Sequence, residues 1–373
     1  MCGAGSCPFP NCRGSEMQAA LERIADRVRG ASSGAPLRLR GGGSKDFYGG
    51  PLLGDVLDLR DYAGVVSYEP TELVITARCG TPLAELEDTL ARHGQMLPFE
   101  PPHFGSAATI GGCVAAGLAG PRRAANGLYY GAVRDYVLGC RLMDGRGEVM
   151  RFGGQVMKNV AGYDVSRLVA GSMGTLGAIV EVSLKVLPVP VARATLRFEV
   201  GDAEAIDRLN AWGGRPIPVS ASAWQSGVLN VRLEGARAAV DASCALLGGV
   251  RVAEEDALRF WQGLREQSEP FFASTGPLWR VSVPSTAAPI ALEGRQLIEW
   301  GGALRWWKTG AEAAAVRAVA KAAGGHATLF RGGERGAGVF TPLEPVLARL
   351  HRNVKAVFDP AGVFNRGRLY PEW

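Results

Sequence analysis

The chain has 373 residues, a formal net charge of +5 and 47% hydrophobic residues. A chain of this length is expected to form more than one core, so we predict two domains. No apolar run reaches the roughly 20 residues that cross a bilayer, and Lys and Arg form no dense block, so the composition favours neither a membrane-spanning nor a nucleic-acid-binding protein.

The seven cysteines do not indicate a metal centre. Four are scattered, as is typical of reduced thiols in the cytoplasm, and three lie near the start, in a Cys-, Gly- and Pro-rich stretch without a CxxC pair: Cys2, Cys7 and Cys12. We predict no metal site and interpret residues 1–14 as a disordered tail. No basic segment followed by an apolar one begins the chain, so a cytoplasmic location is expected.

The first folded domain is predicted for residues 15–190. Ser15 and Gln18 form a capping box, which predicts a helix that ends at Gly30. A second helix is expected to begin with Thr81 as its cap and to end at Gly94. Strands are predicted at residues 37–40, 56–59, 65–68, 73–77, 136–143, 148–152 and 178–186. Pro188 and Pro190 interrupt the last of these patterns and mark the predicted boundary.

Residues 191–340 are predicted to form a second domain. Strands are expected at residues 195–200, 219–225, 228–234, 278–283, 304–308 and 326–331, and helices at 203–212, 236–247, 255–267, 289–300 and 312–323. This order indicates an antiparallel sheet with helices on one face, and so an α+β protein. A helix at 343–358 begins the C-terminal segment, residues 341–373. The domain also carries five tryptophans, more aromatic surface than we expect it to bury, which favours a partner interface: Trp261, Trp279, Trp300, Trp306 and Trp307. Three of them, Trp300, Trp306 and Trp307, fit a core or a subunit interface better than a substrate cage.

Three glycine-rich segments carry the functional signal. Residues 99–120 contain one Asp, Glu, Lys or Arg residue and are otherwise rich in Gly and Ala. Gly111 and Gly112 can bring backbone N–H groups close to an anion, and Thr109 adds a hydroxyl. Taken alone, this segment fits two interpretations equally well. One is an anion-binding segment, and the other is a purely structural role, as a flexible loop or as a helix packed closely on a sheet.

The other two segments strengthen the interpretation. The strand-like residues 37–40 run directly into Gly41-Gly42-Gly43-Ser44, with Arg38, Arg40 and Lys45 nearby, which is typical of a phosphate-binding loop. Further on, Gly171, Gly174 and Gly177 recur at intervals of three. Their spacing does not fit a Rossmann turn, and close helix–strand packing would also explain them. Neither an ATP-binding loop nor a dinucleotide fingerprint is present.

These three segments, in this order, resemble the FAD-binding domain of the vanillyl-alcohol-oxidase/PCMH flavoprotein family. The resemblance covers residues 37–188 firmly and the rest loosely. It implies a PCMH-type FAD-binding domain of two α/β subdomains, an antiparallel cap domain and a C-terminal segment that returns to the flavin. It also implies an FAD-dependent oxidoreductase acting on the CH–OH group of a 2-hydroxy acid such as glycolate. Such a chain would work beside a larger FAD-containing subunit and an iron–sulfur subunit, and would reach the inner membrane face only through them.

The resemblance also indicates which residues would contact FAD. They are Arg40, Gly41, Gly42, Gly43, Ser44, Lys45, Pro101, Ser106, Thr109, Ile110, Gly111, Gly112, Gly162, Tyr163, Asp164, Gly174, Thr175, Ile179 and Asn365. Ser44 stands where many relatives have the His that attaches flavin covalently, so non-covalent FAD is expected. Two positions depart from the pattern: Met173 replaces a usual Glu, and Arg366 replaces a frequent Pro.

The catalytic residues stay unassigned at this level. A base must take the hydroxyl proton, and an Arg usually holds a 2-hydroxy acid's carboxylate. The four histidines are His93, His103, His326 and His351, of which His103 lies nearest the glycine segments. The related full-length dehydrogenases use a paired-His metal motif in the cap, and this sequence has no HxxH. Three interpretations remain open: a 2-hydroxy-acid dehydrogenase component, a non-catalytic FAD-holding relay or scaffold subunit, and a stand-alone sugar or alditol oxidase.

Overall fold

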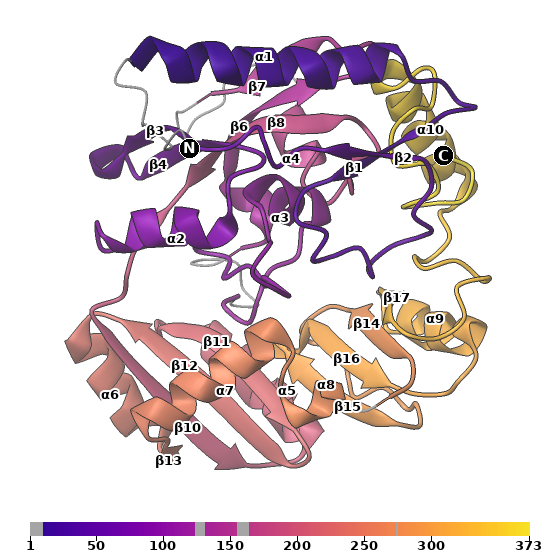
Figure 1. Ribbon diagram of the computed structural model, residues 1–373. Coiled ribbons are helices and arrows are strands. Elements are labelled where there is room, and N and C mark those ends of the chain that lie inside the picture. Colours follow the sequence, from indigo (N-terminus) through magenta and orange to yellow (C-terminus); the bar gives the residue numbers. More distant parts are fainter. Residues whose placement is uncertain (1–9, 124–130, 155–163, 274) are drawn as a thin grey trace, which may run out of the picture.

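The computed structural model describes residues 10–123, 131–154, 164–273 and 275–373 (Figure 1). Two large sheets organise the chain, one of five strands and one of eight. In Figure 1 the half that contains the five-stranded sheet lies above the eight-stranded sheet, with the first helix along its upper side. The C-terminal segment runs from the lower half back to the upper one.

The five-stranded sheet has the order β3-β4-β8-β6-β7 and is antiparallel throughout. Its strands are β3 (Val65–Glu69), β4 (Val74–Arg78), β6 (Val137–Met143), β7 (Val149–Gly153) and β8 (Ala178–Lys185). Two small pairs accompany it, parallel β1 (Leu37–Arg40) with β2 (Asp55–Asp58), and β5 (Gln95–Met96) with β9 (Leu187–Pro188). The helices of this half are α1 (Pro10–Arg29), α2 (Leu83–Ala91), α3 (Ile110–Ala116) and α4 (Val165–Leu168), and the 3-10 turns η1 (Pro70–Glu72) and η2 (Val133–Tyr136) complete it. All seven predicted strands are confirmed.

The eight-stranded antiparallel sheet has the order β13-β10-β12-β11-β15-β16-β14-β17. Its strands are β10 (Ala192–Glu199), β11 (Val219–Gln225), β12 (Val228–Gly235), β13 (Val250–Arg251), β14 (Leu278–Ser282), β15 (Arg295–Glu299), β16 (Leu304–Lys308) and β17 (His326–Arg331). The helices are α5 (Asp202–Gly213), α6 (Arg237–Leu247), α7 (Glu254–Glu266), α8 (Pro270–Ala273) and α9 (Ala313–Ala322), with the turn η3 (Trp300–Gly302). The predicted fold class, α+β with an antiparallel second sheet, is confirmed.

Helices α5, α6 and α9 cover one face of this sheet, where Leu229, Val231 and Val281 pack against them. Helix α7 lies on the other face, where its Trp261 packs with Ala221 and Ala223 of β11. Successive residues of a strand point to opposite faces, and the next residue of β11, Trp224, packs on the first face. This side of the sheet faces the upper half, because Tyr48, Leu118 and Met173 of that half belong to the same core cluster.

Three sequence predictions about helices are wrong. Helix α1 begins at Pro10 rather than at Ser15, and proline suits a first helical position because its missing N–H is not needed there. Residues 10–14 are therefore not part of a disordered tail, and residues 1–9 lie outside the described residues. Thr81 does not cap α2: its hydroxyl donates to Arg78 O (2.7 Å) and accepts from Gly64 N (2.9 Å). Most of the helix expected at residues 289–300 is irregular or strand, because β15 pairs with both β11 and β16.

These five tryptophans of the second half are all buried within this chain, with 2–6% of the surface of each residue exposed. The prediction that they form a partner interface is therefore wrong for these residues. Instead, Trp300 and Trp306 belong to the core between the halves, together with Tyr48, Leu118 and Met173 of the upper half. Burying these large rings holds the two halves together.

Glu100 joins the halves electrostatically. Its carboxylate accepts two hydrogen bonds from Arg232 of β12, at 3.0 and 2.9 Å, and lies 3.6 Å from the Arg122 guanidinium. Glu100 has a positive φ of 47°, a rare conformation for a residue with a side chain. The position is therefore set by the ion pairs rather than by backbone preference.

The C-terminal segment is fixed by a buried ion pair. In α10 (Pro345–Phe358) the Lys355 ammonium pairs with Asp359 and donates to Thr175 O (2.6 Å) and Phe364 O (3.1 Å). Asp359 in turn accepts from the backbone N–H groups of Val363 and Phe364, each at 2.9 Å. These contacts place residues 363–365 beside β1, where Leu37 N donates to Val363 O.

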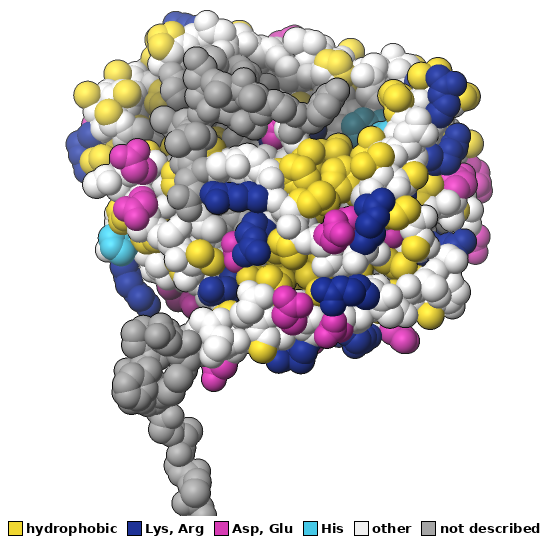
Figure 2. Space-filling view, turned by 90° about the horizontal axis from the view of Figure 1, so that it is seen from above, with side chains coloured by type: hydrophobic (Ala, Val, Ile, Leu, Met, Phe, Trp, Pro, Cys, Tyr) yellow, Lys and Arg dark blue, Asp and Glu magenta, His cyan; other side chains and the backbone are white. Residues whose placement is uncertain are grey.

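The surface charges are mixed rather than segregated. On the face shown in Figure 2, Lys and Arg side chains are scattered among Asp and Glu side chains, without a block of one sign. The small net positive charge therefore produces no basic surface on this face of the kind that binds nucleic acid.

Candidate functional site

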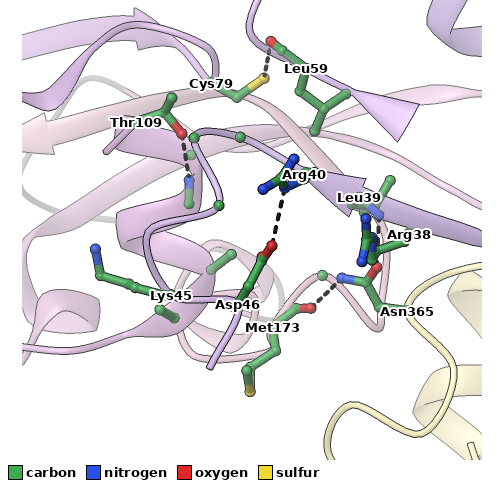
Figure 3. A pocket seen from close by; sticks show the side chains of 18 of the residues that line it. Arg38, Leu39, Arg40, Lys45, Asp46, Leu59, Cys79, Thr109, Met173 and Asn365 are labelled. Atoms are coloured by element: carbon green, nitrogen blue, oxygen red, sulfur yellow. Dashed lines mark hydrogen bonds and ion pairs between the residues drawn. The ribbon is translucent and has the colours of Figure 1, made fainter. Parts of the chain in front are cut away.

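A cavity with about 850 Å³ of empty volume opens where β1 ends in the upper half. Figure 3 shows its side chains, which come from the glycine loop after β1, from helix α3, from the segment before β8 and from the C-terminal segment. We call it the glycine pocket.

In the glycine loop, residues 41–45, the first two glycines lie so close to their neighbours that a side chain is excluded at either position. A Cβ on Gly42 would lie 1.4 Å from Ala107 O, and one on Gly41 would lie 2.2 Å from Thr109 Oγ1. Among the described residues, no acceptor bonds the backbone N–H groups of Gly42, Gly43 or Ser44. Consecutive free N–H groups at a strand end form an anion-binding site.

Helix α3 contributes space rather than N–H groups. Thr109 caps it, and the hydroxyl accepts from Gly112 N at 3.3 Å. Gly111 N donates to Cys79 O at 2.9 Å, so the expectation that both glycines offer N–H groups to an anion is wrong. A Cβ on Gly111 would lie 2.5 Å from Cys79 Cβ, whereas one on Gly112 meets only Thr109 Oγ1, at 3.2 Å. Gly111 is needed for packing, and Gly112 keeps the pocket open.

The charged side chains of the pocket are mostly cationic. Arg38, Arg40, Lys45 and Arg368 line it, and Asp46 is the acidic side chain, paired with Arg40 at 3.1 Å. The Nε of Arg38 is buried and has no hydrogen-bond partner among the described residues. Burial lowers the pKa of Lys45, and it lowers the pKa of Arg368 to about 10. Unpaired, partly desolvated cations favour an anionic occupant.

Asn365 ties three segments together at the edge of the pocket (Figure 3). Its Oδ1 accepts from Leu39 N at 2.7 Å, and its Nδ2 donates to Met173 O at 2.6 Å. Met173 has a positive φ of 53°, and Gly174 follows at 71°. The usual Glu of the pattern is therefore not needed for this turn, which is set by Asn365 and by the bond from Met173 N to Ala115 O (2.8 Å).

Replacing Asn365 with Ala is expected to loosen this corner of the pocket. Leu39 N–H and Met173 O lose their partners, and a buried unsatisfied group costs about 1–3 kcal/mol. We expect a lower free energy of unfolding and roughly tenfold weaker FAD binding, measured by denaturant titration and flavin fluorescence. Asn353→Ala on the exposed side of α10 is the control, and equal behaviour of both variants would contradict this role.

The structure brings together most of the residues predicted from sequence. Twelve line the glycine pocket: Arg40, Gly41, Gly42, Gly43, Ser44, Lys45, Thr109, Gly111, Gly112, Gly174, Ile179 and Asn365. Five do not line it: Pro101, Ser106, Ile110, Asp164 and Thr175. Ile110 and Thr175 are buried in the core, Ser106 and Asp164 are exposed, and Pro101 O accepts from Arg265. Gly162 and Tyr163 lie outside the described residues.

Several lining residues were missed. They include Leu52, Leu59, Cys79, Ala115, Ala116, Gly177 and Arg368. Cys79 and Leu59 reach the pocket because each follows the last residue of a strand, β4 and β2, that ends beside it. Arg368 follows Asn365 closely in a tail with the pattern Asn-Arg-Gly-Arg, and this second basic residue near a predicted contact was the available signal.

The thiols near the pocket are unreactive. Burial raises the pKa of Cys79 to about 12 and that of Cys113 to about 11, so neither forms a thiolate near neutral pH. Cys113 is fully packed in the core of the upper half, as expected. His103 does not line the pocket, and its ring lies 2.9 Å from Glu87.

Two further features bear on chemistry and location. In the part of the chain that the structure describes, no three His, Cys, Asp or Glu side chains gather where they could hold a metal ion. None of the described helices has the length and apolar character needed to cross a membrane.

The fold and the glycine pocket define a protein of the FAD-binding class, and the FAD binding domain family matches residues 19–153. The chain is 51% identical over 355 residues to glycolate oxidase subunit GlcE of Escherichia coli (strain K12), which covers 95% of this chain and 97% of that protein. The chain therefore belongs to the family of this subunit, as the resemblance predicted.

Two further matches are more distant. Glycolate oxidase subunit GlcD of Bacillus subtilis (strain 168) is 34% identical over 143 residues, covering 38% of this chain and 29% of that protein. Among solved structures, alkyldihydroxyacetonephosphate synthase matches with a TM-score of 0.61 at 15% identity, covering 93% of this chain and 73% of that one. At this identity the match supports the fold alone, which extends over both halves.

Proposed function

We propose that the chain holds one FAD non-covalently in the glycine pocket and serves as the FAD-binding subunit of a complex that oxidises a 2-hydroxy acid, glycolate, to glyoxylate. The observation that carries the proposal is the glycine loop, whose free N–H groups lie among unpaired cations in a chain of this family.

The residues divide into two roles. The N–H groups of Gly42, Gly43 and Ser44, with Arg38, Lys45 and Arg368 beside them, suit the phosphates. Gly112 and Gly174 leave room for the cofactor, and Asn365 fixes the segments around it. When bound, FAD accepts a hydride from the carbon that bears the substrate's hydroxyl.

The FAD is expected to be released intact when the protein is denatured. Ser44 cannot form the linkage that a His would, and both thiols near the pocket are kept protonated by burial. Acid precipitation of the purified protein, followed by absorbance of pellet and supernatant, checks this. Yellow colour that stays in the washed pellet would contradict non-covalent binding.

The partners we propose are a larger FAD-containing subunit and an iron–sulfur subunit. The names of the relatives, subunits of glycolate oxidase, support a complex of several subunits. The described cysteines are dispersed, so an electron path through iron–sulfur clusters would need another chain. We expect the complex to be cytoplasmic and to reach the inner membrane face through these partners.

Two alternatives predict different results. A relay or scaffold subunit would support turnover only beside a partner that oxidises the acid, and a sugar or alditol oxidase would work alone with O2. Anaerobic mixing of the FAD-loaded chain with glycolate, D-lactate or an alditol, alone and with its copurified partners, separates them. Bleaching of the isolated chain by an alditol but not by glycolate would overturn the proposed function.

A further inference from the structure

Helix α10 is buried only at its C-terminal end. Lys355 and Phe358 are its buried residues, and the ion pair between Lys355 and Asp359 fixes that end to the upper half. The first two turns, residues 345–351, contain no buried residue. Figure 1 shows α10 at the edge of the molecule, on the right of the upper half. Helices in proteins are mostly stabilised by packing of an apolar face, and these two turns lack such packing within the described chain.

One side of α10 exposes a row of apolar side chains. Four of them have exposed fractions of 48–65%: Val346, Leu347, Leu350 and Val357. No other described helix or strand exposes more than one large apolar side chain. Contiguous exposed apolar surface of this kind marks an interaction site. Together with half-buried Val354, these residues form what we call the α10 stripe.

The spacing of the stripe indicates what kind of surface it fits. Positions 347, 350, 354 and 357 all carry Leu or Val, so the steps between them are three, four and three residues. This spacing places the side chains along one side of the helix, and it is the pattern of helices that pack lengthwise on each other. The stripe therefore fits an apolar row on a second helix.

The charges beside the stripe are mainly positive. The exposed charged residues of α10 are Arg349 and Arg352, and the helix contains no Asp or Glu. Exposed Arg146 lies at the C-terminal end, where it donates to a backbone carbonyl of α10 at 3.4 Å. At the other end Glu344, just before the helix, pairs with Lys321 at 3.0 Å and adds no net charge. A complementary surface is therefore acidic.

We propose that the α10 stripe docks a helix of a partner subunit, and that Asp and Glu border the apolar row of that helix. A second copy of this chain fits poorly, because two α10 helices packed on each other would bring their positive borders together. Helices that lie in a membrane interface typically carry Trp or Phe on the apolar side, and the stripe has neither. The existence of a partner subunit rests on the proposed function, whereas the place of the interface rests on the stripe.

Photo-crosslinking of the complex purified from the native host through a tag on this chain tests the proposal. With p-benzoylphenylalanine at position 350, mass spectrometry should identify a crosslinked peptide from a partner subunit. We expect this peptide to carry apolar residues at the same three-four spacing and more Asp and Glu than Lys and Arg. The control position is Leu246 on α6, 57% exposed and outside the stripe, which should give no crosslink to that peptide.

A charge within the stripe should disrupt the complex. Leu350→Glu is expected to weaken assembly at least tenfold, measured by size-exclusion chromatography over a dilution series, because it sets a carboxylate against an acidic partner. Leu246→Glu should assemble like the unchanged chain. Arg349→Glu combined with Arg352→Glu should also weaken assembly, and this loss should shrink at high salt because exposed charges are screened. Circular dichroism and FAD content of the isolated chains check that each variant is folded.

Several outcomes would overturn the proposal. These are undiminished assembly of folded Leu350→Glu, a chain that copurifies with no partner, and a crosslinked peptide without the acidic and apolar pattern. Dimers of the isolated chain that depend on Leu350 would assign the stripe to a second copy. Sedimentation with phosphatidylglycerol vesicles that depends on Leu350 would assign it to the membrane, and either result would also overturn the proposal. A complex that assembles through the stripe but does not oxidise glycolate would keep the interface and overturn the proposed function instead.

Discussion

Replacing Gly112 with leucine is expected to abolish FAD binding while the chain still folds. The glycine lies on α3 at the wall of the glycine pocket, and a Cβ there meets no backbone atom, only Thr109 Oγ1 at 3.2 Å. The added side chain would therefore grow into the space of the cofactor rather than into the protein. Gly111→Leu is expected to behave differently, because its Cβ would collide with Cys79, and this variant should fail to fold.

Three measurements separate these outcomes: flavin absorbance of the purified protein, circular dichroism, and the Tm with and without added FAD. A ligand that binds only the folded state raises the Tm with its concentration, so the Tm of Gly112→Leu should no longer respond to FAD. The matched control is Gly201→Leu in the second half, an exposed glycine with φ −67° and no atom within 4 Å of a Cβ. Full flavin occupancy in Gly112→Leu would mean that FAD binds elsewhere.

Replacing Glu100 with glutamine is expected to destabilise the chain strongly near neutral pH. The change removes the carboxylate of the upper half that Arg122 and Arg232 share, while Glu234 of β12 stays 3.1 and 3.4 Å from the two guanidinium groups. Removing one partner of a buried ion pair typically costs about 3–5 kcal/mol, and because Glu234 remains we expect a loss at the lower end of this range. Denaturant titration of both proteins at pH 7 should show a loss of this size, whereas Glu85→Gln, at an exposed position on α2, should change little.

The loss should depend on pH in a defined direction. Burial alone would raise the pKa of Glu100, but the attraction of Arg232 and Arg122 is stronger and lowers it from 4.5 to about 2. A lowered pKa means that the folded state releases the proton more readily than the unfolded one, so the stabilisation is complete above about pH 4.5. The difference between the two proteins should shrink as the pH falls from 4.5 towards 2. A difference that stays constant over this range would contradict the ion-pair explanation.

Strand positions were predictable because their patterns are local. The alternation in residues 178–186 and the turn residues around 144–147 each identify their strands without reference to the rest of the chain. Residues 295–299 show the limit of this approach. Five residues carry too short a pattern to separate strand from helix, and the decision comes from β11 and β16, which pair with them from both sides.

The glycine pocket was predictable in its segments but not in the role of each residue. Gly111 and Gly112 are neighbours in one motif, yet one packs on Cys79 and the other borders the pocket, and only the approach of β4 decides which. The family resemblance likewise implied that the tail returns to the flavin site, but not that Asn365 would bond both Leu39 and Met173. The tryptophans were misjudged for a related reason. Trp261, Trp300 and Trp306 belong to the core that the two halves share, and Trp279 and Trp307 are buried inside the second half against α9.

The central claim is that this chain takes part in 2-hydroxy-acid oxidation through the FAD in its glycine pocket. The most direct test is a complex assembled from the chain and its copurified partners, with glycolate as donor and a dye as acceptor. We predict that a complex containing the Gly112→Leu chain assembles, lacks the FAD of this subunit and reduces the dye at least tenfold more slowly than the unchanged complex. An unchanged rate in an assembled complex without that FAD would contradict the claim.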